Sequence, residues 1–245
     1  MVQISAKGRI VLPLDFDSFD QAKSAVKELK DHIGLFKVGL TLFLKEGKTI
    51  LDYLQGEVGA DRVFLDLKFL DIPETVANAS AVMDPFHVKF MTVHASQGAS
   101  VLRAAVGALR GGTQVLAITV LTSATDAELS GLKMNQTVKE RVLLLAQIAK
   151  GAKCAGVVCS GLEARDVKRE CGQDFIVVTP GIRPKGAEIS KDDQQRKMTP
   201  GEAIKNGADY VVVGRPINRS SDRVGAARKI AEEIEEALPV RPPQK

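Results

Sequence analysis

The sequence predicts an α/β fold, a (β/α)8 TIM barrel that forms a single domain over residues 1–245. Eight short apolar runs rich in β-branched and aromatic residues alternate with helical patterns, and no linker divides the chain. The chain has 245 residues, 44% of them hydrophobic, which is enough to bury one large core. A doubly wound open sheet is the alternative. The absence of a G-x-G-x-x-G motif after the first strand disfavours a dinucleotide-binding version of it.

The eight predicted strands are short apolar runs of the kind that a buried parallel sheet requires. They cover residues 10–16, 35–43, 62–68, 88–94, 114–122, 154–159, 175–179 and 210–213.

The helical patterns between the strands have recognisable ends. Ser18 is a candidate N-cap, Pro73 occupies a first helical turn, where proline is tolerated, and Gly207 ends a short helix. Residues 183–197 lack apolar periodicity and are predicted to form a loop. The predicted helices cover residues 18–33, 46–55, 73–83, 98–110, 126–129, 137–150, 162–170, 199–206 and 222–238.

The composition argues against two kinds of partner. The net charge is +4 with acidic and basic residues interleaved, whereas a nucleic-acid-binding surface needs a concentrated basic stripe. Trp is absent and aromatic residues are 4% of the chain, which leaves little to stack on bases. No apolar run of about 18 residues occurs, and the first nine residues lack the apolar core of a signal peptide. We therefore predict a cytoplasmic protein without nucleic-acid or membrane partners.

The three cysteines, Cys154, Cys159 and Cys171, show no C-x-x-C spacing and are odd in number. Two of them lie in a predicted apolar strand. We predict reduced packing residues and no metal site.

The stretch of residues 62–75 begins as an apolar strand and then carries three charges in six positions, Asp66, Lys68 and Asp71. Asp66 and Lys68 point to the same face of a strand, and Asp71 is out of phase with them. Charges this close inside a sheet cost free energy unless they pair, and a buried ion pair adds little stability over apolar residues. The cluster therefore favours a functional role. The alternative is a structural pair at a solvent-exposed strand end.

In a barrel, Lys37 on the second strand lies beside the third strand. We predict a chain of alternating sign in the order Lys37, Asp66, Lys68, Asp71. Such a chain satisfies its own members and restrains each side chain. It offers a positioned lysine as proton donor and presents negative charge to a substrate.

Active sites of such barrels lie at the carboxyl ends of the strands, and the loops after strands seven and eight commonly bind phosphate. Here these loops read Thr179-Pro180-Gly181-Ile182-Arg183 and Val213-Gly214-Arg215-Pro216. Glycine lets backbone N–H groups approach an anion, and arginine binds phosphate oxygens with two parallel N–H groups. The alternative is two ordinary turns with surface arginines. Other polar residues at strand ends are Asp15, His94, Thr122 and Ser160.

The stretch from Asp66-Leu67-Lys68 through Asp71-Ile72-Pro73 to Thr75 resembles the signature of the orotidine 5′-phosphate decarboxylase family, bacterial type. Leu70 and Glu74 depart from it, since the family often has His and Asn there. His94 also matches a family position, either near the site or as a core histidine. Further motifs match in order over nearly the whole chain: Leu14-Asp15, Lys37-Val38-Gly39, Leu121-Thr122-Ser123, Pro180-Gly181-Ile182-Arg183-Pro184, Asp193-Gln194, Met198-Thr199-Pro200 and Val213-Gly214-Arg215-Pro216.

This resemblance implies a cofactor-independent conversion of orotidine 5′-phosphate to UMP, the last step of de novo pyrimidine nucleotide synthesis. It implies a homodimer with both sites at the interface, in which Asp71 and Thr75 reach the neighbouring subunit's site. Lys68 would protonate carbon C6 of the pyrimidine, and Asp66 would lie against the substrate carboxylate and repel it. The implied catalytic residues are Lys37, Asp66, Lys68 and Asp71. Of the implied substrate-binding residues, Asp15 and Lys37 would contact the ribose, and Thr122 and Ser123 would lie at the pyrimidine. Arg183, Gln194 and Arg215 would hold the phosphate, with Gln194 on a closing loop. The remaining implied substrate-binding residues are Asp66, Thr75, Pro180 and Gly214.

Two other hypotheses are open at this point. A relative of 3-keto-gulonate-6-phosphate decarboxylase would share the Asp-x-Lys-x-x-Asp pattern but use Mg²⁺ with an acidic residue on the second strand. This chain has Lys37 there, which repels a metal. The other hypothesis is a non-catalytic protein that binds nucleotide monophosphates, against which Lys68 and the intact cluster argue.

Overall fold

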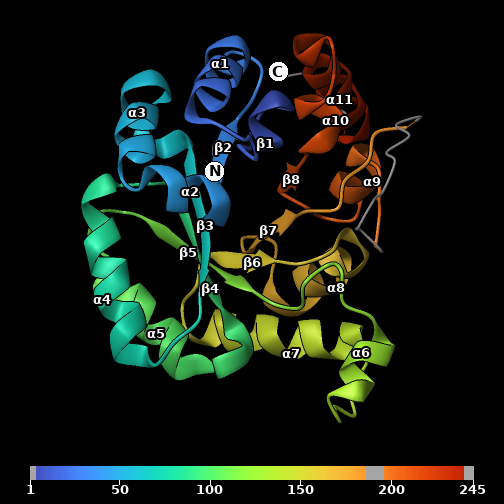
Figure 1. Cartoon of the computed structure of the whole chain (residues 1–245). Coiled ribbons are helices and arrows are strands. Elements are labelled where there is room, and N and C mark those ends of the chain that lie inside the picture. Colours follow the sequence, from blue (N-terminus) through green and yellow to red (C-terminus); the bar gives the residue numbers. More distant parts are fainter. Residues whose placement is uncertain (1–3, 186–195, 240–245) are drawn as a thin grey trace, which may run out of the picture.

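The computed structural model describes residues 4–185 and 196–239, and it confirms the predicted barrel. Within these residues, eight parallel strands pair in sequence order and β8 closes onto β1. The strands lie at the centre of the molecule, and the helices form the outer ring (Figure 1). The strands are β1 (Ile10–Pro13), β2 (Leu35–Gly39), β3 (Val63–Phe69), β4 (Phe90–His94), β5 (Gln114–Ile118), β6 (Gly156–Val158), β7 (Ile176–Thr179) and β8 (Tyr210–Val212). The closed barrel excludes the open-sheet alternative.

The helices connect the strands in the expected alternation. They are α1 (Phe19–Leu29), α2 (Leu40–Glu46), α3 (Thr49–Val58), α4 (Pro73–Met83), α5 (Ala99–Ala108), α6 (Asp126–Gly131), α7 (Val138–Gly151), α8 (Gly161–Cys171), α9 (Pro200–Lys205), α10 (Arg215–Asn218) and α11 (Arg223–Ala237). Four 3₁₀ turns occur in the described residues: η1 (Lys7–Arg9), η2 (Ala60–Arg62), η3 (Asp84–Phe86) and η4 (Ala95–Gln97). Among the described residues, no helix is long and apolar enough to cross a membrane. The cytoplasmic location stays a prediction.

The second predicted strand is too long, because the residues after Gly39 form helix α2. The run that follows Gly39 is apolar, and a short apolar run does not by itself distinguish strand from helix. In the helix, Leu42 is buried while Leu40 and Leu44 are exposed one turn apart. The short helix α10 after β8 was likewise not predicted.

Several other strands end before the predicted boundary. β1 ends at Pro13 and β5 at Ile118, although the predicted runs continued to residues 16 and 122. Leu14 and Val120 beyond these ends are still buried. Apolar character reports burial, whereas strand assignment depends on backbone pairing, so the two boundaries differ.

The barrel interior is filled with side chains. Phe90 makes edge-to-face ring contacts with Phe64 and Tyr210, with centroids 5.9 and 5.4 Å apart. A larger apolar cluster packs the helices against the strands. The inner cluster consists of Val11, Leu35, Phe64, Phe90, Leu116, Val178 and Tyr210.

A polar layer lies above this inner cluster, toward the carboxyl ends of the strands. Lys37, Asp66 and Thr92 each follow a member of the inner cluster by two residues. Side chains alternate along a strand, so these three also point into the barrel. The charged layer therefore lies directly above the packed apolar layer.

Candidate active site

A cavity of about 710 Å³ opens at the carboxyl ends of the strands. Its lining combines apolar side chains with the charged layer and with the loops after β7 and β8. Ten of the residues predicted from the sequence line it: Asp15, Lys37, Asp66, Lys68, Thr122, Ser123, Pro180, Arg183, Gly214 and Arg215.

Two predicted residues in the described part of the chain do not line this cavity. Asp71 and Thr75 are exposed and do not line it. Asp71 lies beyond the end of β3, and its Oδ1 accepts a hydrogen bond of 2.7 Å from the backbone N–H of Ile72. Gln194 lies outside the described residues.

The centre of the cavity wall is an ion cluster that joins β2 and β3. Lys37 Nζ lies 3.1 Å, and Lys68 Nζ 2.8 Å, from the same carboxylate oxygen, Oδ2 of Asp66. The Asp66 side chain is 9% exposed, which does not fit a pair at a solvent-exposed strand end. The first three members of the predicted chain therefore meet, with a net charge of one positive unit (two ammonium groups, one carboxylate).

The charges of Lys37 and Lys68 determine the protonation state of Asp66. Burial on its own raises the pKa of this carboxyl, but the charges of Lys37 and Lys68, together with their hydrogen bonds, outweigh burial and lower the pKa below its ordinary value. Asp66 is thus a carboxylate at neutral pH, and it holds both ammonium groups in place.

Asp15 joins the same wall from the end of β1. A Cβ placed on Gly39 would lie 3.4 Å from Lys37 Nζ and 3.5 Å from Asp15 Oδ1, so both side-chain ends lie close to Gly39.

The backbone of β3 is irregular where it carries the cluster. Its register with β4 shifts between Leu65 and Phe69, and Lys68 has a φ of 52°. The alternation argued from the sequence therefore does not describe this segment, although Asp66 and Lys68 still meet. Thr92 on β4, which sequence reasoning missed, hydrogen-bonds both residues. Its position two residues after Phe90, on the inward face, was the available signal.

The loops after β7 and β8 are built around glycines. Gly181 has a φ of +77°, a conformation that favours glycine. A Cβ on Gly214 would lie 2.8 Å from Pro13 Cγ, so the β8 loop packs directly on the end of β1. Arg183 follows Gly181 and donates its backbone N–H to Met198 at 2.9 Å. Both arginines of the predicted phosphate site, Arg183 and Arg215, thus reach one cavity.

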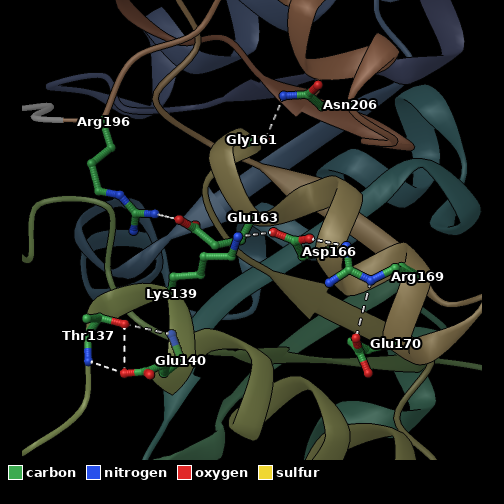
Figure 2. Close-up of polar contacts among 10 residues, drawn as sticks. All are labelled: Thr137, Lys139, Glu140, Gly161, Glu163, Asp166, Arg169, Glu170, Arg196 and Asn206. Carbon is green, nitrogen blue, oxygen red and sulfur yellow. Dashed lines mark hydrogen bonds and ion pairs between the residues drawn. The ribbon is translucent and has the colours of Figure 1, made fainter.

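A buried ion pair outside the cavity supports the β7 loop. Arg196 reaches Glu163 on α8, as Figure 2 shows, and the side chains are 13% and 5% exposed. Met198 packs on Gly161, where an added Cβ would lie 2.8 Å from its sulfur, and Asn206 Nδ2 donates to the Gly161 carbonyl at 3.2 Å. The segment that holds the Arg183 backbone is therefore tied to the first turn of α8.

Burial holds two further titratable side chains, His94 and Cys159, in their uncharged forms at neutral pH. Burial lowers the pKa of half-buried His94, and the charge of Lys68 lowers it further against a smaller opposing effect of Asp66. Burial raises the pKa of Cys159 to about 12, which makes it a protonated thiol. Among the residues that the structure describes, no group of three or more His, Cys, Asp or Glu side chains could hold a metal ion.

The fold and this cavity place the chain among the (β/α)8-barrel enzymes, whose active sites occupy this end of the barrel. The family model described as "Orotidine 5′-phosphate decarboxylase / HUMPS family" matches residues 8–230. The chain belongs to this family, which confirms the resemblance seen in its motifs.

Individual relatives agree with the family match. The chain is 43% identical over 236 residues to an orotidine 5′-phosphate decarboxylase of Desulfosudis oleivorans, covering 95% of each chain. It is 44% identical over 244 residues to one of Heliobacterium modesticaldum, covering 96% of this chain and 99% of the relative. The crystal structure of orotidine 5′-phosphate decarboxylase from Lactobacillus acidophilus has 34% identity and a TM-score of 0.79, covering 92% of this chain and 98% of that one.

Proposed function

We propose that this enzyme converts orotidine 5′-phosphate to UMP without a cofactor, as the last step of de novo pyrimidine nucleotide synthesis. The observation that carries the proposal is one cavity lined both by the Lys37–Asp66–Lys68 cluster and by Arg183 and Arg215. The cluster suits a reaction that develops negative charge, and the arginines suit a phosphate. The named relatives support this substrate.

Lys68 is the proposed proton donor. When the bond between C6 and the carboxyl group breaks, CO₂ leaves and the electron pair stays on C6, where the pyrimidine ring cannot easily delocalise it. An ammonium group aimed at this carbon stabilises the developing charge. Lys68 then transfers a proton from Nζ to C6 and regains one from solvent, which balances the reaction.

Asp66 and Lys37 keep Lys68 in position for the proton transfer. Asp66 holds Lys68 Nζ at 2.8 Å, and Lys37 helps to keep Asp66 ionised. The negative charge of Asp66 beside the substrate carboxylate would also disfavour the ground state. The charged groups that favour decarboxylation are therefore already in position before the substrate binds.

Phosphate binding supplies free energy at a distance from C6. Arg183 and Arg215 belong to loops after β7 and β8, whereas the charged cluster belongs to β2 and β3. Binding energy from a remote group can organise the reacting centre. Orotidine without phosphate should therefore react far more slowly than the nucleotide.

A second copy of the chain is proposed to complete each site. Asp71 is exposed outside its own cavity, beside Leu70 and Ile72, which are 51% and 64% exposed. Leu44 on α2 is a further exposed apolar side chain, 80% exposed. Exposed apolar residues of this kind are typical of an interface, and a partner's Asp71 would add a carboxylate to a site that holds two lysines.

The test is an absorbance assay of orotidine 5′-phosphate consumption by the purified protein, with and without a chelator. Asp66 already binds two ammonium groups, so it is a poor ligand for a divalent ion, and we expect equal rates in both conditions. Lys68→Ala should lose at least roughly a thousand-fold in kcat. Failure of the unmodified protein to consume the nucleotide would contradict the proposal, and activity lost to chelator would revive the Mg²⁺-dependent alternative.

A further inference from the structure

Thr92 on β4 lies opposite the irregular part of β3. The ladder between these strands shifts register between Leu65 and Phe69, so the three residues 66–68 of β3 face Thr92 alone. Thr92 is 1% exposed and points into the barrel. A backbone N–H in the irregular segment has lost its ladder partner and needs another acceptor.

The Thr92 hydroxyl serves both partners of the catalytic ion pair. The backbone N–H of Lys68 donates to Thr92 Oγ1 at 2.9 Å, and Thr92 Oγ1 donates to Asp66 Oδ1 at 3.0 Å. The direction of the second bond follows from chemistry, because an ionised carboxylate can only accept. Oδ1 of Asp66 thereby faces Thr92, and Oδ2 is left to the two lysines.

The Lys68 backbone depends on this contact. Its φ of 52° is in the left-handed region, which is unfavourable for a residue with a side chain. Such backbone persists only where the surroundings hold it. The hydrogen bond from Lys68 N–H to Thr92 is a restraint on that conformation from a neighbouring strand.

We propose that Thr92 is a positioning residue for decarboxylation: one buried hydroxyl orients the Asp66 carboxylate and holds the backbone from which Lys68 reaches the reacting carbon. The proposal rests on the proposed function of this site. Thr92 does not line the cavity and acts through the other two residues. Its removal should therefore impair the chemical step and spare the phosphate loops on the far strands.

The test replaces the hydroxyl without changing the size of the side chain. In Thr92→Val, we expect kcat for orotidine 5′-phosphate to fall roughly a hundred-fold, as for a misplaced catalytic group. KM and the Kd of UMP should change less than about threefold, since the arginine loops are untouched. Thr92→Ser keeps the hydroxyl and should keep kcat within about fivefold of the unmodified enzyme.

Thr119→Val is the matched control. The Thr119 side chain is also buried, 4% exposed, but its hydroxyl donates only to the Val158 carbonyl at 2.9 Å. This variant loses a buried hydrogen bond near the same end of the barrel without touching the cluster, so kcat should stay near that of the unmodified enzyme. An equal loss of kcat in both valine variants would overturn the proposal, as would an unchanged kcat in Thr92→Val.

A crystal structure of Thr92→Val gives a measurement that does not depend on activity. We expect Lys68 to leave the left-handed region or its Nζ to move away from Asp66, and unchanged geometry at both residues would overturn the proposal. If the unmodified protein fails to decarboxylate the nucleotide, the proposed function is wrong while this structural test still stands. If Thr92→Val does not fold, Thr92→Ala, which also lacks the hydroxyl, replaces it with the same expected loss of kcat.

Discussion

Mixing two inactive variants, Lys68→Ala and Asp71→Ala, tests whether each active site is built from two chains. Lys68 lines the cavity of its own chain, whereas Asp71 is exposed beyond the end of β3 and does not line it. If Asp71 completes the neighbour's site in a two-fold symmetric dimer, the two variants carry their defects in different sites. Each variant alone should be inactive, and the mixture should recover activity.

The size of the recovery follows from counting sites. When equal amounts of two variants reassort at random, about half of the dimers are mixed. In a mixed dimer one site collects both defects, and the other has an intact Lys68 and an intact Asp71. About a quarter of all sites should therefore work, and the mixture should show about a quarter of the unmodified turnover with an unchanged KM.

The assay is orotidine 5′-phosphate consumption after unfolding and refolding the variants together, with subunit exchange confirmed by mass spectrometry of differently tagged chains. The matched control pairs Lys68→Ala with Asp66→Ala, both of which remove a member of the ion cluster. Both residues line the cavity of the same chain, so every site in the mixed dimer has one defect and no activity should return. If exchange is confirmed and the Lys68→Ala and Asp71→Ala mixture stays inactive, Asp71 does not act across a two-fold interface.

Three further changes test other parts of the structure. Arg215→Ala should weaken UMP binding by about 1.5–3 kcal/mol, roughly ten- to a hundred-fold by calorimetry, with a smaller effect on the protonation step; equal reaction of orotidine and its phosphate would contradict this. His94→Gln should flatten the fall in stability as pH drops below 6.5. The pKa of His94 is lowered in the fold, so its stabilising contribution is present above that pH and is lost as pH falls through the lowered pKa, which denaturant titration at several pH values measures; an unchanged slope would refute it. Glu163→Ala should cost about 3–5 kcal/mol of unfolding free energy because it leaves Arg196 buried without its partner; replacing both by apolar residues should cost less, and additive losses would contradict the pairing.

Much of the fold is predictable because barrel elements are encoded locally. Each strand is a run of apolar residues, and each helix has its own apolar period and caps, such as Ser18, whose side chain accepts from the Gln21 N–H at the start of α1. The order of strands follows from their alternation with helices. The run after Gly39 was mispredicted for the same reason, since a short apolar run satisfies either pattern.

Most of the charged residues that line the cavity were also predictable. Lys37, Asp66, Arg183 and Arg215 are polar groups at strand ends, and a parallel barrel brings all such ends to one face. Residue type and position within a strand are sequence properties. The chemistry expected at this face therefore follows from the sequence.

The tertiary structure alone decided how these residues are held. Thr92 and Asp66 are 26 positions apart, and Arg196 and Glu163 are 33 apart, so their contacts exist only after the strands have paired and the helices have packed. The register shift in β3 and the positive φ of Lys68 likewise depend on the strand beside them. A sequence displays which groups are available along one strand, but a hydrogen bond between strands depends on register, and register is set by the packing of the whole barrel.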